Sequence, residues 1–312
     1  MTRIASLANS STRSAPEPVL DPRVLASIAD LELVARILVD GTVSGLHRSP
    51  FHGYSAEFSQ YRHYRAGDDL KYVDWKLFAR TDRVFTKQYR ETTNVAAYLG
   101  LDGSASMGFA GGNSVSKFDY ARVLAAALGQ LIAWQGDAVG LVVYDGSVRT
   151  HVGARLGQSH FRKVLIGLKA ATPGSGGEAI AVRKCIDLIR GRGVLLLFTD
   201  AYEEDRVESE IRRALTIGHE VALFHVLTRE EIDFPYRGDL EIEDAESGKR
   251  VLANAGRIGP QYRAAMTAFL ERWRSRAASY GFAYAQAVTD LRPDQVLREY
   301  LLKRTAARSG QR

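Results

Sequence analysis

Carboxylate and hydroxyl side chains follow two short apolar segments of this sequence. Asp102, Ser104 and Ser106 alternate directly after the first segment, and Asp200 follows the second. In extended chain every second side chain points the same way, so the three alternating oxygens can face one point. An all-oxygen group without thiolate or imidazole suits Mg²⁺ or Mn²⁺ and does not suit Zn²⁺. If the two segments are neighbouring strands, the sequence predicts a Mg²⁺-type (or Mn²⁺) metal site.

A second interpretation of the same residues is structural. Asp102 and Asp200 could cap the helices that follow them, while the serine hydroxyls satisfy amides of the loop. Ser116 and Asp119 open the next helical pattern as a capping box. Both interpretations place the aspartates between a strand and a helix.

Alternating strand and helix patterns must position these residues. Five near-continuous apolar runs predict buried parallel strands at 95–101, 138–144, 193–199, 220–226 and 282–288. Amphipathic patterns predict helices at 116–134, 158–170, 178–190, 205–217, 259–280 and 291–304. Residues 146–152 add an edge strand. This order predicts an α/β fold with a doubly wound, mostly parallel sheet, which binds ligands at the carboxyl ends of its strands.

The chain divides by composition into four parts. Residues 1–20 are expected to be a disordered tail, and 21–92 an N-terminal helix ending near Asp40-Gly41 followed by an accessory lobe. Residues 93–304 form the α/β domain, with 231–256 as an inserted loop or β-ribbon, and 305–312 form a second tail.

The accessory lobe is rich in aromatic, basic and acidic residues. We expect ion pairs that fix a compact lobe against the sheet domain, with Trp75 and Phe78 anchoring it to apolar surface. A protein-docking surface is an alternative. The interleaved acids, which repel phosphate, argue against a nucleic-acid groove. The predicted pairs join the cations Arg62, Arg65 and Arg80 to carboxylates drawn from Glu57, Asp68, Asp69 and Asp74.

Bulk composition narrows the class of protein. The 42 basic and 36 acidic residues give a net charge of only +6, which does not by itself indicate a nucleic-acid partner. The single cysteine, Cys185, excludes an internal disulfide and fits a reducing compartment. No run of 18 apolar residues is present, so we expect no membrane span and a cytoplasmic location.

Common catalytic motifs are incomplete. The Gly-Lys pair at 248–249 is followed by Arg250 and therefore forms no phosphate-binding loop of the Walker type. Ser106 lacks the first glycine of a hydrolase nucleophile elbow. The zincin-like His219-Glu220 is followed by Leu223 where a second histidine is needed. These absences favour a non-catalytic binding module, and a metal-dependent phosphoester hydrolase that uses the same oxygen shell is the alternative.

Two segments resemble known families. Asp102-Gly103-Ser104-Ala105-Ser106-Met107 resembles the metal-ion-dependent adhesion site of von Willebrand factor A domains. The block 49–91 resembles the bacterial family called domain of unknown function fifty-eight, and the similarity extends from about Leu31 to Arg304. The residues that carry it are Gly53, Glu57, Phe58, Arg62, Tyr64, Gly67, Asp68, Asp69, Val73, Asp74, Trp75, Ala79, Arg80, Thr81 and Glu91.

The resemblance implies a set of ligands and a role. In A domains the ion is held by residues that correspond to Asp102, Ser104, Ser106 and Asp200, and by a threonine from another loop. That threonine has no counterpart in register, because Gly176-Gly177-Glu178 stands there and Glu178 could itself be a ligand. The family implies an adaptor that works with a MoxR-type AAA+ ATPase on a client protein, with the metal binding a partner's carboxylate.

Overall fold

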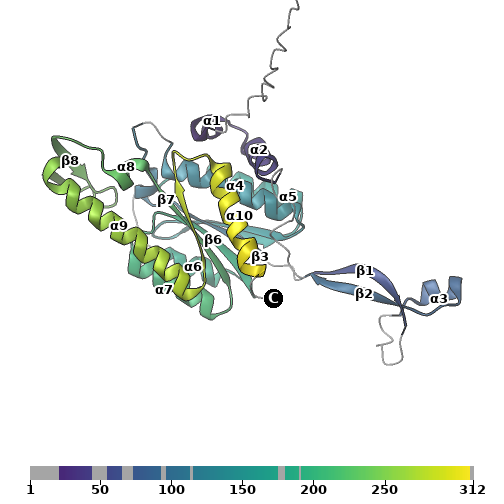
Figure 1. The fold of residues 1–312 in the computed structure, drawn as a ribbon. Coiled ribbons are helices and arrows are strands. Elements are labelled where there is room, and N and C mark those ends of the chain that lie inside the picture. The colour runs from purple at the N-terminus through teal and green to yellow at the C-terminus, as the bar shows by residue number, and fades with distance from the viewer. Residues whose placement is uncertain are drawn as a thin grey trace, which may run out of the picture.

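A six-stranded, mostly parallel sheet forms the centre of the protein (Figure 1). The computed structural model describes residues 21–43, 55–64, 73–92, 96–112, 115–174, 180–189 and 191–309. The strand order is β10-β7-β6-β3-β4-β5, and only β5 runs antiparallel to its neighbour. The strands are β3 Ala96–Asp102, β4 Ala138–Tyr144, β5 Val148–Arg155, β6 Gly193–Thr199, β7 Glu220–Leu227 and β10 Ala283–Val288.

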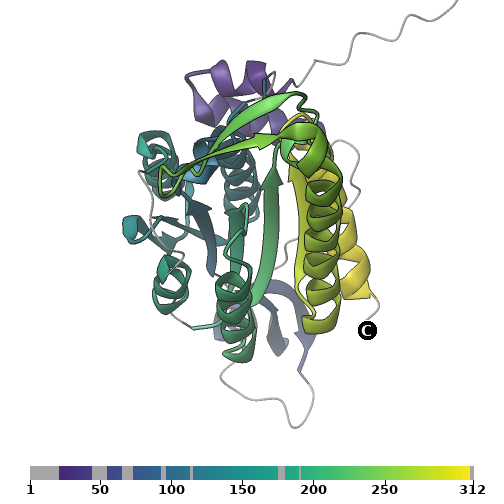
Figure 2. The same cartoon turned by 90° about the vertical axis from the view of Figure 1, so that its left-hand side faces the viewer.

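Helices cover both faces of this sheet (Figure 2). Ten α-helices are present in the described part of the chain. One face packs against α2 Leu31–Val43, α4 Lys117–Trp134, α5 Gln158–Ala170 and α10 Pro293–Ser309. The other face packs against α6 Ile180–Asp187, α7 Glu204–Thr216 and α9 Ala255–Tyr280. Apolar side chains therefore leave the strands on both sides, which explains their near-continuous apolar sequences.

The position of β3 creates the site. From β3 the chain runs to β4 on one side, and it later returns through β6 on the other side of β3. Leu101 of β3 lies opposite Phe198 of β6 in parallel register, so both strands end at the same edge. The predicted adjacency of these strands is confirmed. Ligands of doubly wound sheets bind where the strand order reverses in this way.

The N-terminal helical segment differs from its prediction. Two helices, α1 Pro22–Ser27 and α2, replace the single helix expected, because Asp30 accepts hydrogen bonds from the amides of Glu32 and Leu33 and starts a new helix. Leu38 of α2 is fully buried in the core on one face of the sheet. Residues 21–43 therefore belong to the α/β body and not to the accessory lobe. At the other end, α10 extends to Ser309, beyond the boundary expected at 304.

The accessory lobe is a projecting hairpin. Strands β1 Ser55–His63 and β2 Phe85–Thr92 pair antiparallel, α3 Trp75–Thr81 lies in their connection, and the hairpin points away from the body (Figure 1). Trp75 is 59% exposed and packs edge-on to Phe78 at 6.3 Å between ring centroids. The expectation of a compact lobe fixed against the sheet domain is therefore wrong, because the hairpin projects from the body and these two rings pack on each other.

The structure places three residues of the predicted ion pairs, and the pairs themselves stay a prediction. Asp74 is buried and caps α3, accepting from the amides of Lys76 and Leu77 at 3.0 Å each. Arg80 is exposed in the last turn of α3, where a cation is favourable for the helix dipole. Arg62 is half-buried on β1. Arg65, Asp68 and Asp69 lie outside the described residues.

The segment 231–256 forms the predicted β-ribbon. Strands β8 Asp239–Glu243 and β9 Arg250–Asn254 pair antiparallel after the short helix α8 Arg229–Asp233. Figure 2 shows this ribbon lying across one end of the sheet. The ribbon contacts the first part of α9, so it forms a wall beside the ends of the strands.

Candidate functional site

The loop after β3 holds three of the predicted ligands. Asp102 is buried, and its Oδ1 accepts a hydrogen bond from the amide of Ser104 at 2.9 Å. A short 3₁₀ helix, Ala105–Gly108, begins directly after Ser104. The turn brings the hydroxyls of Ser104 and Ser106 to 3.2 Å from each other. The structure therefore gathers the alternating side chains, as the spacing predicts.

The end of β6 completes the group. Thr199 Oγ1 donates to Asp102 Oδ2 at 2.6 Å and accepts from the amide of Ala201 at 3.0 Å. The carbonyl of Asp200 lies 2.8 Å from Nε2 of the fully buried His225, which fixes the backbone there. Ala201 has a φ of 51°, an unfavourable conformation for a residue with a Cβ. Such strain is typical of functional sites.

Burial gives the site unusual electrostatics. The pKa of Asp102 is raised to about 7, first because burial disfavours its charged form and second because Asp200 is close to it. Hydrogen bonds from Thr199 and Ser104 act in the opposite direction. A cation beside Asp102 would stabilise its carboxylate form.

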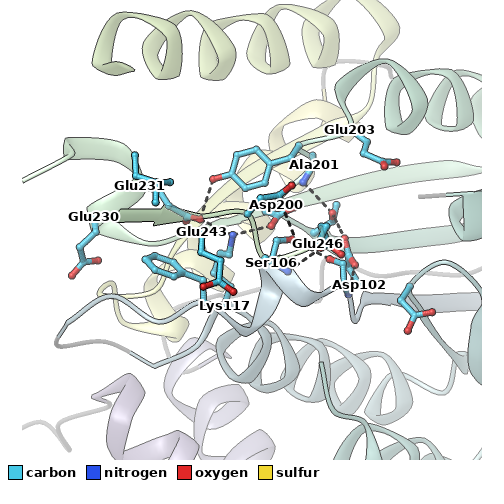
Figure 3. Close-up of a pocket in the computed structure, with 18 of the residues that line it drawn as sticks. Asp102, Ser106, Lys117, Asp200, Ala201, Glu203, Glu230, Glu231, Glu243 and Glu246 are labelled. Carbon is cyan, nitrogen blue, oxygen red and sulfur yellow. Dashed lines mark hydrogen bonds and ion pairs between the residues drawn. The ribbon is translucent and has the colours of Figure 1, made fainter. Parts of the chain in front are cut away.

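A buried lysine supplies positive charge to the second carboxylate. Lys117 Nζ donates to Asp200 Oδ2 at 2.8 Å and to Glu231 Oε1 at 2.6 Å (Figure 3). Tyr202 also donates to Glu231, at 3.0 Å. Burial lowers the pKa of Lys117, but the two carboxylates outweigh burial and leave that pKa raised. The ammonium group therefore stays charged.

Sequence reasoning did not identify Lys117, Glu231 or the Thr199 hydrogen bond. One signal was available for Lys117. It is the first residue of α4, where the positive end of the helix dipole disfavours a cation. A lysine at that position needs acidic partners, and in this protein they come from residues distant in sequence.

The oxygen donors fit a hard cation, with one competitor. Asp102 and Asp200 offer carboxylates, Ser104 and Ser106 offer hydroxyls, and Mg²⁺ keeps several waters in sites of this kind. Among the described residues, no group of three or more carboxylate, histidine or cysteine side chains is arranged to hold an ion. Lys117 competes for Asp200, so we expect modest affinity.

The loop expected to supply a threonine is only partly described. Gly174 donates its amide to the carbonyl of Gly103 at 2.6 Å, so the segment before Ser175 lies beside the Asp102 loop. Thr172 is exposed, and its carbonyl accepts from Arg149. Glu178, the other predicted ligand, lies outside the described residues.

A cleft of about 630 Å³ opens above these residues (Figure 3). The strand ends, α8, the β8–β9 ribbon and Tyr262 of α9 line it. Glu246, in the turn of the ribbon, accepts from the amide of Ser106 at 3.0 Å. The carboxylates that line the cleft are Asp102, Asp145, Asp200, Glu203, Glu230, Glu231, Glu241, Glu243, Asp244 and Glu246. Among the described residues that line the cleft, Lys117 is the single Lys or Arg.

Solved structures similar to this chain are of low identity. A conserved hypothetical protein BatB from Bacteroides thetaiotaomicron is 18% identical, with a TM-score of 0.43, and the match covers 68% of this chain and 99% of that chain. An aerotolerance-related membrane protein from Bacteroides fragilis is 17% identical, with a TM-score of 0.43, over 67% and 99%. An uncharacterised membrane-spanning protein from Vibrio fischeri is 14% identical, with a TM-score of 0.23, over 68% and 98%.

These descriptions correct the expected location. Two of the three similar structures come from proteins described as membrane proteins, which contradicts the prediction of a cytoplasmic location. Within the described residues, no helix has the length and apolar character to cross a membrane. We therefore withdraw the cytoplasmic assignment and replace it with no other.

Similar sequences give the family. Uncharacterised proteins of Mycobacterium tuberculosis and Mycobacterium bovis are each 30% identical over 232 residues, which is 73% of this chain and 73% of each relative. The family model described as "Protein of unknown function DUF58" matches residues 60–272. The chain therefore belongs to the DUF58 family, whose function is unknown.

Proposed function

We propose that this chain is a non-catalytic protein-interaction module of the von Willebrand factor A-like type. A Mg²⁺-type cation at the Asp102 loop contacts a partner protein, and the chain serves as an adaptor for a MoxR-type AAA+ ATPase. The observation that carries the proposal is the convergence of Asp102, Ser104, Ser106 and Asp200 at one edge of the sheet, where the strand order reverses.

The loop supports a contact with a carboxylate. In the family that the loop resembles, the ion leaves one coordination position for an acidic residue of the partner. Glu246 already places a carboxylate 3.0 Å from the amide of Ser106, so the loop can accept a carboxylate from outside it. A partner's aspartate or glutamate would replace Glu246 at this position. The ion would then supply a directional bond to the partner.

The projecting hairpin supports an adaptor with two contact surfaces. The exposed Trp75 begins α3, and this helix lies at the end of the hairpin that points away from the sheet (Figure 1). Large exposed aromatic side chains are common anchors of protein interfaces. One partner at the cleft and another at the hairpin would give the arrangement that an adaptor needs. The ATPase partner itself is inferred from the family resemblance.

Electrostatics disfavour the alternative of a phosphoester hydrolase. A phosphate monoester carries more negative charge than a partner's single carboxylate, so the carboxylates that line the cleft repel it more strongly. Lys117, which could otherwise attract phosphate, is held by Asp200 and Glu231. The cleft therefore favours a binding role over phosphate chemistry.

Binding to the purified MoxR-type ATPase, measured by biolayer interferometry in Mg²⁺ and in EDTA, tests the proposal. We expect EDTA or Asp102→Asn to abolish binding, while the control Glu299→Gln, an exposed residue of α10, leaves it unchanged. Equal binding in Mg²⁺ and EDTA would contradict the proposal. Turnover of p-nitrophenyl phosphate that is lost in Asp102→Asn would favour the hydrolase.

A further inference from the structure

The cleft beside the Asp102 loop combines negative charge with apolar walls. Lys117 neutralises part of Asp200 and Glu231, and Arg250 contacts Glu241 and Glu243. Carboxylates remain in excess after these pairs are counted. Such an excess in a concave surface concentrates cations and repels anions. Negative charge alone would attract any cation, so the class of ligand depends on the side chains that form the walls of the cleft.

Aromatic and aliphatic side chains form much of these walls. Phe234 and Tyr262 lie 4.6 Å apart between ring centroids, and Phe234 also packs on Tyr236 at 5.2 Å. Leu240 and Ile242 of the ribbon face the same cleft. Clefts of this size with apolar walls and a few polar groups are typical ligand sites. A ligand that fills this cleft therefore carries apolar groups as well as positive charge.

An incompletely bonded carboxylate gives a separate indication. Oε2 of Glu230 is buried and makes no hydrogen bond in the described structure. Leaving such an atom unsatisfied is costly. A donor entering from the cleft would reduce that cost, and a cationic side chain is the strongest such donor for a carboxylate.

We propose that this cleft binds a cationic segment of a partner protein, in which lysine or arginine alternates with aliphatic residues. The aliphatic side chains pack on Phe234, Tyr262 and Ile242, and the cations contact the carboxylates of the rim. Tyrosine rings of the cleft add cation–π contacts. The inference deepens the proposed function by giving the partner's chemistry, since cations flanking an acidic residue would offset the repulsion that this residue meets. Binding of the cationic segment does not itself require the metal.

Fluorescence anisotropy of the full chain with two labelled peptides tests this inference. The probe is a capped hexapeptide of alternating leucine and arginine. The control peptide has glutamate in place of each arginine. Measurements are made in EDTA, so that failure of the metal-dependent ATPase contact and failure of this inference are distinguishable. We expect binding of the arginine peptide only, and weaker binding as salt is raised, because salt screens the exposed charges.

Matched variants locate the binding. The double variant Glu230→Gln with Glu243→Gln should bind the arginine peptide roughly three- to tenfold more weakly, as expected for two partly exposed charge contacts. Glu299→Gln should bind like the wild type, and a common denaturation midpoint shows that the variants are folded. Equal binding of both peptides, or no effect of the double variant, would overturn the inference. Displacement of the peptide by an equal concentration of spermidine would also overturn it, because a small polyamine would then suffice.

Discussion

Replacing Lys117 by methionine is expected to destabilise the protein strongly. The side chains of Lys117, Asp200 and Glu231 are 1%, 5% and 12% exposed, and the ammonium lies within 2.8 Å of both carboxylates. Methionine fills similar volume but removes the charge. Two buried carboxylates would then lack their cation. Breaking a buried pair on one side typically costs about 3–5 kcal/mol, and we expect that loss in the free energy of unfolding.

Urea denaturation of the wild type and of Lys117→Met, in EDTA, measures this loss. The control is Lys163→Met, at an exposed position of α5, which should change stability by less than ~0.5 kcal/mol. A further variant, with Lys117→Met, Asp200→Asn and Glu231→Gln together, should recover most of the stability. Its recovery is expected because replacing all members of a buried ionic group is often nearly neutral.

The same variant reports on the cation site. Removing the ammonium frees Asp200 and takes away a positive charge, so Mg²⁺ should bind Lys117→Met more tightly than it binds the wild type. At one hundred times its dissociation constant the ion would return about 2.7 kcal/mol of stability. A loss of less than ~1 kcal/mol in EDTA, or no stabilisation by Mg²⁺, would refute the electrostatic reasoning.

Three further changes test other parts of the structure. Asp74→Ala should cost about 0.5–2 kcal/mol through loss of the α3 cap, while Asp74→Asn should be near neutral, as hydrogen exchange of α3 would show. Gly193→Ala should cost about 1–3 kcal/mol in urea denaturation because its Cβ would lie 2.6 Å from the Ala96 carbonyl oxygen, whereas Gly153→Ala meets no atom within 4 Å and should be tolerated. Burial lowers the pKa of His225 from 6.5 to about 4, so its contribution to stability is lost as pH falls through that range. Between pH 7 and pH 4, the free energy of unfolding of His225→Gln should therefore rise by up to ~3 kcal/mol relative to that of the wild type. A difference between the two proteins that does not change with pH would contradict this.

Much of the sheet could be predicted because its strands have simple sequences. The runs at 138–144 and 193–199 are buried on both faces and coincide with β4 and β6. Adjacency of β3 and β6 then brings Asp102 close to Thr199 and Asp200, as the position of the aspartates indicates. Near-continuous apolar runs that end in carboxylates are therefore sufficient to predict this part of the site.

The remaining features depend on contacts between residues far apart in sequence. Lys117 and Glu231 are separated by 114 positions, and no local pattern connects them. Glu246 of the ribbon accepts a hydrogen bond from the amide of Ser106. The sequence predicts the ribbon, but it does not predict the direction in which the ribbon extends. The prediction that the accessory lobe packs on the sheet domain is wrong for a related reason. Balanced charges and aromatic rings suit a lobe packed on the body as well as a projecting hairpin, and composition does not distinguish them.

Cation binding at the Asp102 loop is the central claim, and titration calorimetry of MgCl₂ and MnCl₂ into the full chain tests it most directly. The arrangement of Asp102, Ser104, Ser106 and Asp200 predicts one saturable site at millimolar ion or below, which Asp102→Ala abolishes while the protein stays folded. The absence of saturable heat at millimolar ion, or the same heat from Asp102→Ala, would contradict it. In that case Asp102 and Asp200 would be structural groups, satisfied by Thr199, the Ser104 amide and Lys117.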